Sequence, residues 1–415
     1  MSFQSALSGL NASAKNLDVI GHNIANSGTY GAKSSRAEFA DMYAVALSGG
    51  GGAGNIGIGV QLSAVAQQFT QGNITTTNNP MDIAINGNGF FQVAAPSGSV
   101  NYTRNGQFKL DKDGFIVNND NMKLMGFGAD NQGNILAGSA AAVQLPTAGI
   151  APNPSTRVDL EMNLDARWTA TDPGVAVTPR IDFANRLTYN QATSVTTFDA
   201  QGKPVAVNFY FQQGANPGEV NVYATADGTT VGGTAANPQP VSTLTFSPNG
   251  TLQSASSTSL ALSGVVPNMN NLTMNFGQTT QYGAVFAVTR LSQDGYTAGN
   301  MTGVVIEKDG TITGRYSNGQ TKTAGQVQVA NFRNPQGLQP LGGNLWGATF
   351  AAGSPIPGVP GSGNLGYLQS GALEESNVDL TGQLVEMITA QRNYQANAQT
   401  IKTQDQVMQT AVNLR

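Results

Sequence analysis

The sequence predicts an α+β protein of several domains: a coiled-coil pair of terminal helices and two mainly antiparallel β domains, the outer one inserted into the inner one. Three observations predict this fold. Apolar residues recur every three or four positions at both chain ends, but alternate with polar residues through most of the interior. One hairpin pattern occurs on both sides of the middle region. A chain of 415 residues is also too long for a single typical core.

The C-terminal repeat predicts one long helix that spans 379–413. Steps of four and three residues from Leu380 place apolar side chains along one side, which is the pattern of a coiled-coil seam. The predicted seam positions are Leu380, Leu384, Met387, Tyr394, Ala398, Ile401, Met408 and Val412. A seam this narrow needs a partner helix.

The same count at the N-terminus predicts that partner. Its seam positions are Phe3, Leu7, Leu10, Ala14, Leu17 and Ile24. Each helix is marginal alone, because nucleation is costly and most helical stability comes from packing of the apolar face. We therefore expect the two helices to pair and to order mainly on assembly. In the alternative, they form an ordinary two-helix cap on one globular domain, and periodicity alone leaves that alternative open.

Turn residues divide the interior into short strands. Ile83 and Ile85 precede an Asn-Gly-Asn-Gly turn and Phe91 follows it, which predicts a hairpin. A Leu-Asp-Lys-Asp-Gly-Phe-Ile run at 110–116 resembles the Ile-Glu-Lys-Asp-Gly-Thr-Ile run at 306–312. This recurrence predicts one discontinuous β domain, at 75–147 and 290–371, with a second β domain, a sandwich or barrel, inserted at 148–289. The segments 1–74 and 372–415 would supply the terminal helices and a connector.

The composition favours a protein that contacts copies of itself. Charged residues make up only 11% of the chain, so Asn, Gln, Ser and Thr must form much of the surface, which suits large neutral contacts. The net charge of −4, with scattered Lys and Arg, gives no basic patch for nucleic acid. No apolar run is long enough for membrane insertion. The absence of Cys excludes disulfides and thiolate sites.

The N-terminal residues do not have the pattern of a cleavable signal peptide. Lys15 is the first positive side chain, and no apolar run precedes a small-residue cleavage site. We therefore expect either a cytoplasmic protein or export by a route that reads another signal.

No catalytic pattern stands out, so we predict no enzyme, no cofactor and no metal site. The run from Asp111 to Gly114 hints at a calcium loop, but Ile116 and Met122 occupy the positions where an EF-hand needs Gly and Glu. A hairpin turn is expected there instead. His22 is the only histidine, which leaves almost nothing for His-based sites, and we expect it at a surface or interface.

Carboxylate pairs offer little more chemistry. Glu374 and Glu375 precede the C-terminal helix, where a solvated or helix-start role explains them. A glycosidase with two distant carboxylates stays open as an alternative, although no feature of the sequence points to one.

Motifs at both ends of the chain resemble those of the flagellar axial family of rod, hook and hook-associated proteins. They are Asn-Leu-Asp-Val-Ile-Gly-His-Asn-Ile-Ala-Asn at 16–26, Arg-Asn-Gly-Gln-Phe at 104–108, Gly-Ala-Leu-Glu-Glu-Ser-Asn-Val-Asp-Leu at 371–380 and Ala-Gln-Arg-Asn-Tyr-Gln at 390–395. The resemblance covers about 1–145 and 290–415. In one departure, Ala32 follows Gly31 where the family usually has an aromatic residue.

Within this family the chain resembles the hook proteins, because rod proteins are generally shorter and lack a large insertion such as 148–289. The resemblance implies a structural subunit that polymerises into a flexible helical tube, a universal joint that couples motor and rod to the filament. The two terminal seams would form the polymer core. Implied partners are further copies of the chain, the distal rod protein, the hook cap, the hook–filament junction proteins and the flagellar export apparatus. The implied location is extracellular, at the hook and basal body.

Two alternatives to a hook protein follow from the same residues. One is a distal rod or hook-associated junction protein of the same family. The other, from a different class, is an enzyme or binding module displayed on a β scaffold, which should stay monomeric and keep its activity without both terminal helices.

Overall fold

The computed structural model describes residues 3–42, 57, 59–130, 132–136, 138–146, 148–171, 181–269 and 271–413. The chain folds into two compact units. The first contains Met1–Thr147, Gly303–Arg315 and Thr321–Arg415, and the second contains Ala148–Thr302 and Tyr316–Gln320. The second unit extends past 289, where the sequence places the end of the insertion, because β22 (Ala287–Gln293) pairs with β11 (Arg157–Asp165) of that unit.

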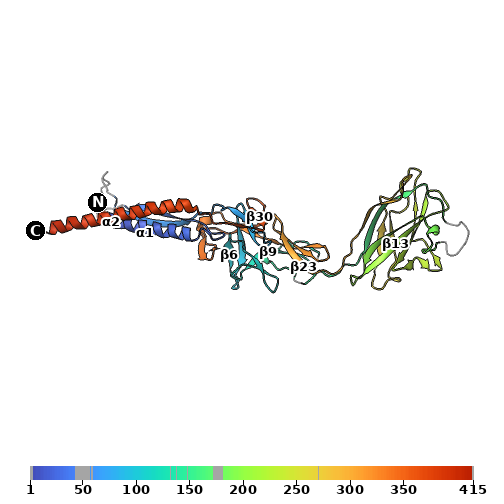
Figure 1. Ribbon diagram of the computed structural model, residues 1–415. Coiled ribbons are helices and arrows are strands. Elements are labelled where there is room, and N and C mark those ends of the chain that lie inside the picture. The colour runs from blue at the N-terminus through green and yellow to red at the C-terminus, as the bar shows by residue number, and fades with distance from the viewer. Residues whose placement is uncertain are drawn as a thin grey trace. The chain divides into compact units, whose positions relative to one another are not determined.

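The first unit carries two long helices side by side, α1 (Phe3–Ala25) and α2 (Leu380–Asn413) (Figure 1). They run antiparallel, because Asn23 near the end of α1 bonds Gln383 near the start of α2, whereas Gly9 lies against Asn397. The predicted pairing of the chain ends is therefore confirmed. No helix in the described part of the chain is long and apolar enough to span a membrane.

One large sheet forms the β part of the first unit. Its main path is β23 (Met301–Ile306), β24 (Thr311–Tyr316), β25 (Thr321–Val327), β9 (Lys123–Gly128), β5 (Phe90–Ala94), β6 (Val100–Thr103), β28 (Leu345–Gly347) and β27 (Gln339–Gly342). Short strands extend it: β7 (Lys109–Leu110), β8 (Ile116–Val117), β10 (Ala141–Ala142), β26 (Val329–Asn331) and β29 (Ile356–Gly358).

Three two-stranded ladders complete the first unit. They are β1 (Ser35–Met42) with β2 (Gly59–Gln67), β3 (Ile74–Thr76) with β31 (Ala372–Glu374), and β4 (Ile83–Asn86) with β30 (Tyr367–Ser370). A short 3₁₀ helix, Pro335–Gly337, precedes β27. The β3–β31 and β4–β30 ladders thus join the segment before α2 to the N-terminal half of the discontinuous unit.

The expected hairpin around 83–93 is wrong. The turn exists, with left-handed Gly87 and Gly89, but β4 pairs with β30 and β5 pairs with β6, β9 and β26. The physical reason is that the segment at Gly366 occupies the space beside the turn: its N–H donates to Asn88 O at 2.7 Å. By contrast, both Asp-Gly hairpins are confirmed, with Gly114 and Gly310 at φ 83° and 82°.

The second unit is a sandwich of two sheets. One sheet contains β19 (Ser257–Leu260), β20 (Leu272–Asn275), β11, β21 (Thr280–Tyr282) and β22, and the other contains β12 (Gln191–Phe198), β13 (Pro204–Gln213), β14 (Glu219–Ala226), β15 (Thr229–Val231) and β18 (Ser242–Thr245). A small ladder joins β16 (Gly233–Thr234) to β17 (Asn237–Pro238), and Arg186–Thr188 form a 3₁₀ turn. Alternating apolar residues from both sheets share one core, as period-two patterning requires.

The strand pairing of the second unit is not purely antiparallel. β11 pairs in parallel with β20 and β21 and antiparallel with β22, so its sheet is mixed. The sequence does not reveal this, because alternation fixes which face of a strand is buried but not the direction of its neighbours.

Candidate polymer interface

α2 turns a seam of mixed amide and apolar side chains towards α1. Gln383 and Asn397 face α1, and positions between and beyond them at steps of four and three lie on the same side of the helix. Ala390 on this seam is only 3% exposed, and Met387 and Ile401 are half-buried. The intramolecular seam is therefore shifted from the predicted one and shares only some of its positions.

The structure divides the predicted seam residues into two groups. Met387, Ala398, Ile401, Leu10, Ala14, Leu17 and Ile24 are half-buried. Phe3, Leu7, Leu380, Leu384, Tyr394, Met408 and Val412 are exposed. The buried residues of α1 are Ala6, Ile20 and Asn23, none of which the sequence analysis selected.

The exposure of Met408 and Val412 has a simple geometric cause. The register pairs Asn23 with Gln383 and Gly9 with Asn397, so Phe3, the first described residue of α1, lies about opposite residue 403. The last turns of α2 consequently extend past the start of α1, as Figure 1 shows. Apolar side chains there have no partner on the described part of α1.

A second exposed apolar strip lies at the start of α2. We call Leu380, Leu384 and Ile388 the helix strip; they are 46%, 46% and 52% exposed. They follow one another at intervals of four, so they lie on one flank of the helix, away from the Gln383 seam. Sequence analysis found Leu380 and Leu384 but missed Ile388, because a strict alternation of four and three steps skips it.

A buried ion cluster fastens the connector after α1 to the β sheet. Glu374 accepts from Lys33 Nζ through Oε1 (2.5 Å) and from Arg104 Nη1 through Oε2 (2.9 Å), and all three side chains are at most 4% exposed. The Gly72 N–H also donates to Oε1 (2.9 Å). Burial lowers the pKa values of Lys33 and Arg104, and the Glu374 carboxylate opposes this shift.

The solvated or helix-start role expected for Glu374 is therefore wrong. The residue ends β31 and is paired on both carboxylate oxygens. Glu375 is half-buried and accepts one bond from Asn73 Nδ2 at 3.3 Å.

Two amide side chains, Asn23 and Asn377, also join the helices to the β strands. Asn23 exchanges two hydrogen bonds with the backbone of Ser35, both 2.8 Å. Asn377, just before α2, accepts from Ser34 N (2.7 Å) and donates to Gln68 O (2.7 Å). These bonds hold the start of α2 and the end of α1 against the β1–β2 ladder, so the two helices emerge from one rigid base.

The other residues singled out in the sequence have ordinary surroundings. His22 is exposed on α1. Asp111 Oδ1 accepts the backbone N–H groups of Asp113 and Phe115, which makes a hairpin turn. In the described part of the chain, no group of three or more acidic or histidine side chains could hold a metal ion.

Comparison with known families defines the class of protein. "Flagella basal body rod protein" matches residues 3–33, and "Flagellar hook protein FlgE/F/G D1 domain" matches 84–164. "Flagellar basal body protein FlaE D2 domain" matches 163–296, and "Flagellar basal body rod FlgEFG protein C-terminal" matches 369–414. These four matches place the chain, with its paired terminal helices and β units, in the rod and hook class of flagellar proteins.

Whole-chain relatives narrow the class. The flagellar hook proteins FlgE of Escherichia coli and Salmonella typhimurium are 41% and 40% identical, with 100% of both chains covered in each case. That of Brucella suis is 30% identical over 99% of this chain and 98% of the relative. The chain belongs to the flagellar hook protein family, and is a structural protein of the flagellar hook and basal body, not an enzyme.

A solved structure supports the fold independently. The crystal structure of Helicobacter pylori flagellar hook protein FlgE2 matches 72% of this chain and 99% of that chain, with a TM-score of 0.51 and 14% identity.

Proposed function

We propose that the exposed apolar residues of α1 and α2 form the cohesive inner layer of a helical tube of this chain. The observation that supports this best is the unpartnered apolar surface on α2: Leu384 is 46% exposed and Met408 62%. A soluble monomer gains nothing from such side chains, whereas neighbouring copies would bury them. Head-to-tail contacts that do not close into a ring generate open helical polymers.

The β regions are proposed to act differently from the helices. We assign 1–74 and 372–415 to the core, and 75–147 and 290–371 to a surrounding β domain. The outer domain is 148–289; the second compact unit of the structure continues to Thr302. Contacts between β domains of neighbouring copies, rich in Asn, Gln and Gly, can slide and re-form at low cost. The coiled-coil seams of the core keep the copies attached to one another. A tube built in this way bends yet transmits torque, as a universal joint must.

We also propose partners at both ends of the tube, on the basis of family membership. We propose that the tube joins the distal rod protein at one end and the hook–filament junction proteins at the other, and grows under a hook cap. Subunits would leave the cell through the flagellar export apparatus, without a cleaved signal peptide, to an extracellular position. The N-terminal sequence of the protein in assembled hooks tests this: Ser2-Phe3 or Met1-Ser2 at its start is expected, and a start beyond Phe3 would contradict it.

Charge placed on the helices should abolish assembly. Leu384→Asp would put a carboxylate into the proposed inner layer, and Leu10→Asp would put one at a half-buried position of α1; in both places burial of an unpaired charge is costly. We expect no tubes by negative-stain electron microscopy after incubation in a sulfate salt, which strengthens apolar burial. Gln399→Asp, a charge on an exposed polar position of α2, is the matched control and should give normal tubes. Normal tubes from Leu384→Asp would contradict the proposal.

Removal of the second unit should leave assembly intact. Two isolated bridges, Ile150 with Gly299 and Asn153 with Tyr296, bring the entering and leaving segments side by side, so a short Gly-Ser linker can replace 148–300 and leave β23 whole. We expect this variant still to form tubes, with an altered bending stiffness measured from their curvature in electron micrographs. Failure of the variant to assemble, while the first unit stays folded, would contradict this division of labour.

A further inference from the structure

Phe350 is fully exposed to solvent on a hydrogen-bonded turn. The side chain is 104% exposed, the highest value among the exposed large apolar residues of the chain that the structure describes. The turn itself is anchored: Thr349 Oγ1 donates to Gly337 O (2.5 Å), and Asn334 Nδ2 donates to Ala351 O (3.1 Å). Ala352 is buried in the aromatic cluster that includes Trp346. These contacts fix the backbone on both sides of Phe350.

A second exposed apolar side chain lies in the β27–β28 hairpin that precedes the turn of Phe350. Leu341 in β27 is 51% exposed, and its side chain lies beside Gly347 of β28. We call Leu341 and Phe350 the hairpin patch. No Asp, Glu, Lys or Arg occurs from 334 to 373, so the segment that carries this patch has no charged side chain of its own; the carboxylate of Asp120 approaches the hairpin at Gly343. Aromatic side chains in surroundings depleted of charge are typical of the buried centre of protein interfaces.

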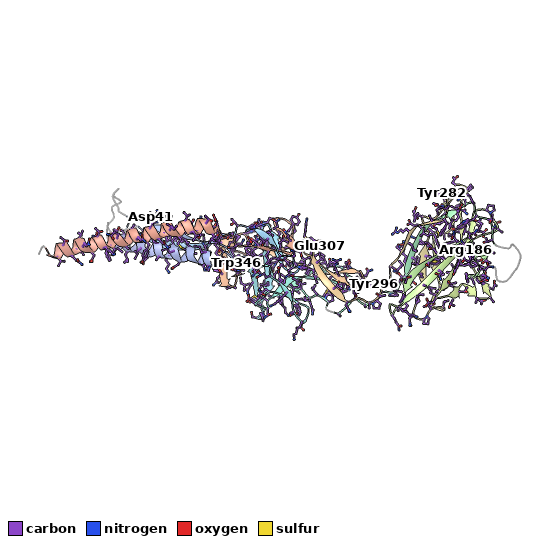
Figure 2. The ribbon with its side chains drawn as sticks, viewed as in Figure 1. Asp41, Arg186, Tyr282, Tyr296, Glu307 and Trp346 are labelled. Carbon is purple, nitrogen blue, oxygen red and sulfur yellow. The ribbon has the colours of Figure 1, made fainter. Side chains whose placement is uncertain are left out.

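A series of contacts links the strand pair that carries Leu341 to the start of α2, which carries the helix strip. Trp346 Nε1 donates to Gln67 Oε1 (2.6 Å), and Gln67 pairs with Ser35 across β1 and β2. Ser35 bonds Asn23, which donates to Gln383 Oε1 (2.9 Å) in the first turns of α2. Trp346 is labelled beside the base of the helices in Figure 2. The hairpin and the start of α2 are thus joined through a short series of contacts.

We infer that the hairpin patch of one copy packs on the helix strip of a neighbouring copy. Within one copy the two surfaces do not cover each other, because both are exposed. Both surfaces belong to the first unit, so adjacent copies in a tube can bring them together, and a patch that meets a different surface on the next copy makes a head-to-tail contact that propagates. This inference rests on the proposed function, the helical tube, and adds a contact between the β sheet of one subunit and the helix of the next.

The absence of native Cys allows a direct test by disulfide trapping. A Phe350→Cys, Leu384→Cys double variant is assembled into tubes, oxidised and run on a non-reducing gel, with Phe350→Cys, Ile388→Cys as a second pair. A disulfide needs Cα atoms within about 7 Å, so it reports close contact. We expect a ladder of dimers, trimers and longer species that collapses on reduction. Mixed tubes of the two single variants should give dimers only.

The matched control pairs Phe350→Cys with Gln399→Cys, an exposed position about 22 Å further along α2. Tubes that form from both pairs but give no more dimer than this control would overturn the inference. A faster-migrating monomer would also overturn it, because the two surfaces would then meet within one copy. A failure of the unmodified chain to form tubes would contradict the proposed function itself, so the two failures are distinguishable.

The patch should also strengthen assembly. We expect Phe350→Ser to raise the critical monomer concentration for tube formation roughly tenfold, the size of effect that loss of an aromatic anchor produces. Leu136→Ser is the control, since Leu136 is 57% exposed in the first unit but lies outside the patch. An unchanged critical concentration for Phe350→Ser would overturn the inference.

Discussion

Replacement of Glu374 by Gln is expected to lower the free energy of unfolding of the first unit by about 3–5 kcal/mol. The change removes the one carboxylate that compensates both Lys33 and Arg104, whose side chains are 0% and 4% exposed. Removal of one partner of a buried ion pair is strongly destabilising because the remaining charge stays buried without compensation. In this cluster two cations would be left.

The two tryptophans allow the effect to be measured on the first unit alone. Trp346 lies in the first unit and Trp168 in the second, so a Trp168→Phe background makes urea unfolding followed by fluorescence specific for the first unit. Glu375→Gln is the matched control, with one long hydrogen bond at 3.3 Å, and should change stability by less than about 0.5 kcal/mol. Equal losses for the two variants would contradict the assigned role of the cluster.

The same variant should respond to pH in a defined direction. Burial lowers the pKa of Lys33 from 10.5, so between its folded and unfolded pKa values the unfolded chain binds more protons, and stability rises with pH. Glu374 opposes that shift, and its loss lowers the Lys33 pKa further and widens the window. The deficit of Glu374→Gln should therefore shrink as pH rises from 7 towards about 10. A deficit that stays constant would show that Lys33 does not titrate in this way.

The helices show what periodicity can predict. The steps of four and three from Leu380 correctly locate a long helix and its need for a partner, because those steps are a local property of the chain. They do not determine which side meets α1. The side of α2 that faces α1 depends on Gly9, which leaves room for Asn397, and on the bond from Asn23 to Gln383. In the sequence, Asn397 and Gln383 look like surface residues.

The ion cluster shows where sequence reasoning stops. Lys33 and Glu374 are 341 positions apart, and no local pattern connects them. Glu374 beside Glu375 has the appearance of a solvated pair, although only the second keeps partial access to water. The one available signal is that both Arg104 and Glu374 lie inside the motifs that resemble the flagellar axial family.

Gly106→Ala, inside one of those motifs, should destabilise the first unit by at least about 3 kcal/mol. An added Cβ would lie 1.6 Å from Ile83 O, and this carbonyl belongs to a backbone segment whose N–H already donates to Gly106 O at 3.0 Å. No rotamer relieves the overlap, so β4 must move away from the segment that carries Arg104. Gly303→Ala, in β23 with open space around the new methyl group, is the control and should stay within about 0.5 kcal/mol of the parent. The urea midpoint of each variant is measured by Trp346 fluorescence. If Gly106→Ala has the same midpoint as Gly303→Ala, the close approach of the segments at Gly106 and Ile83 is not the reason for glycine at this position.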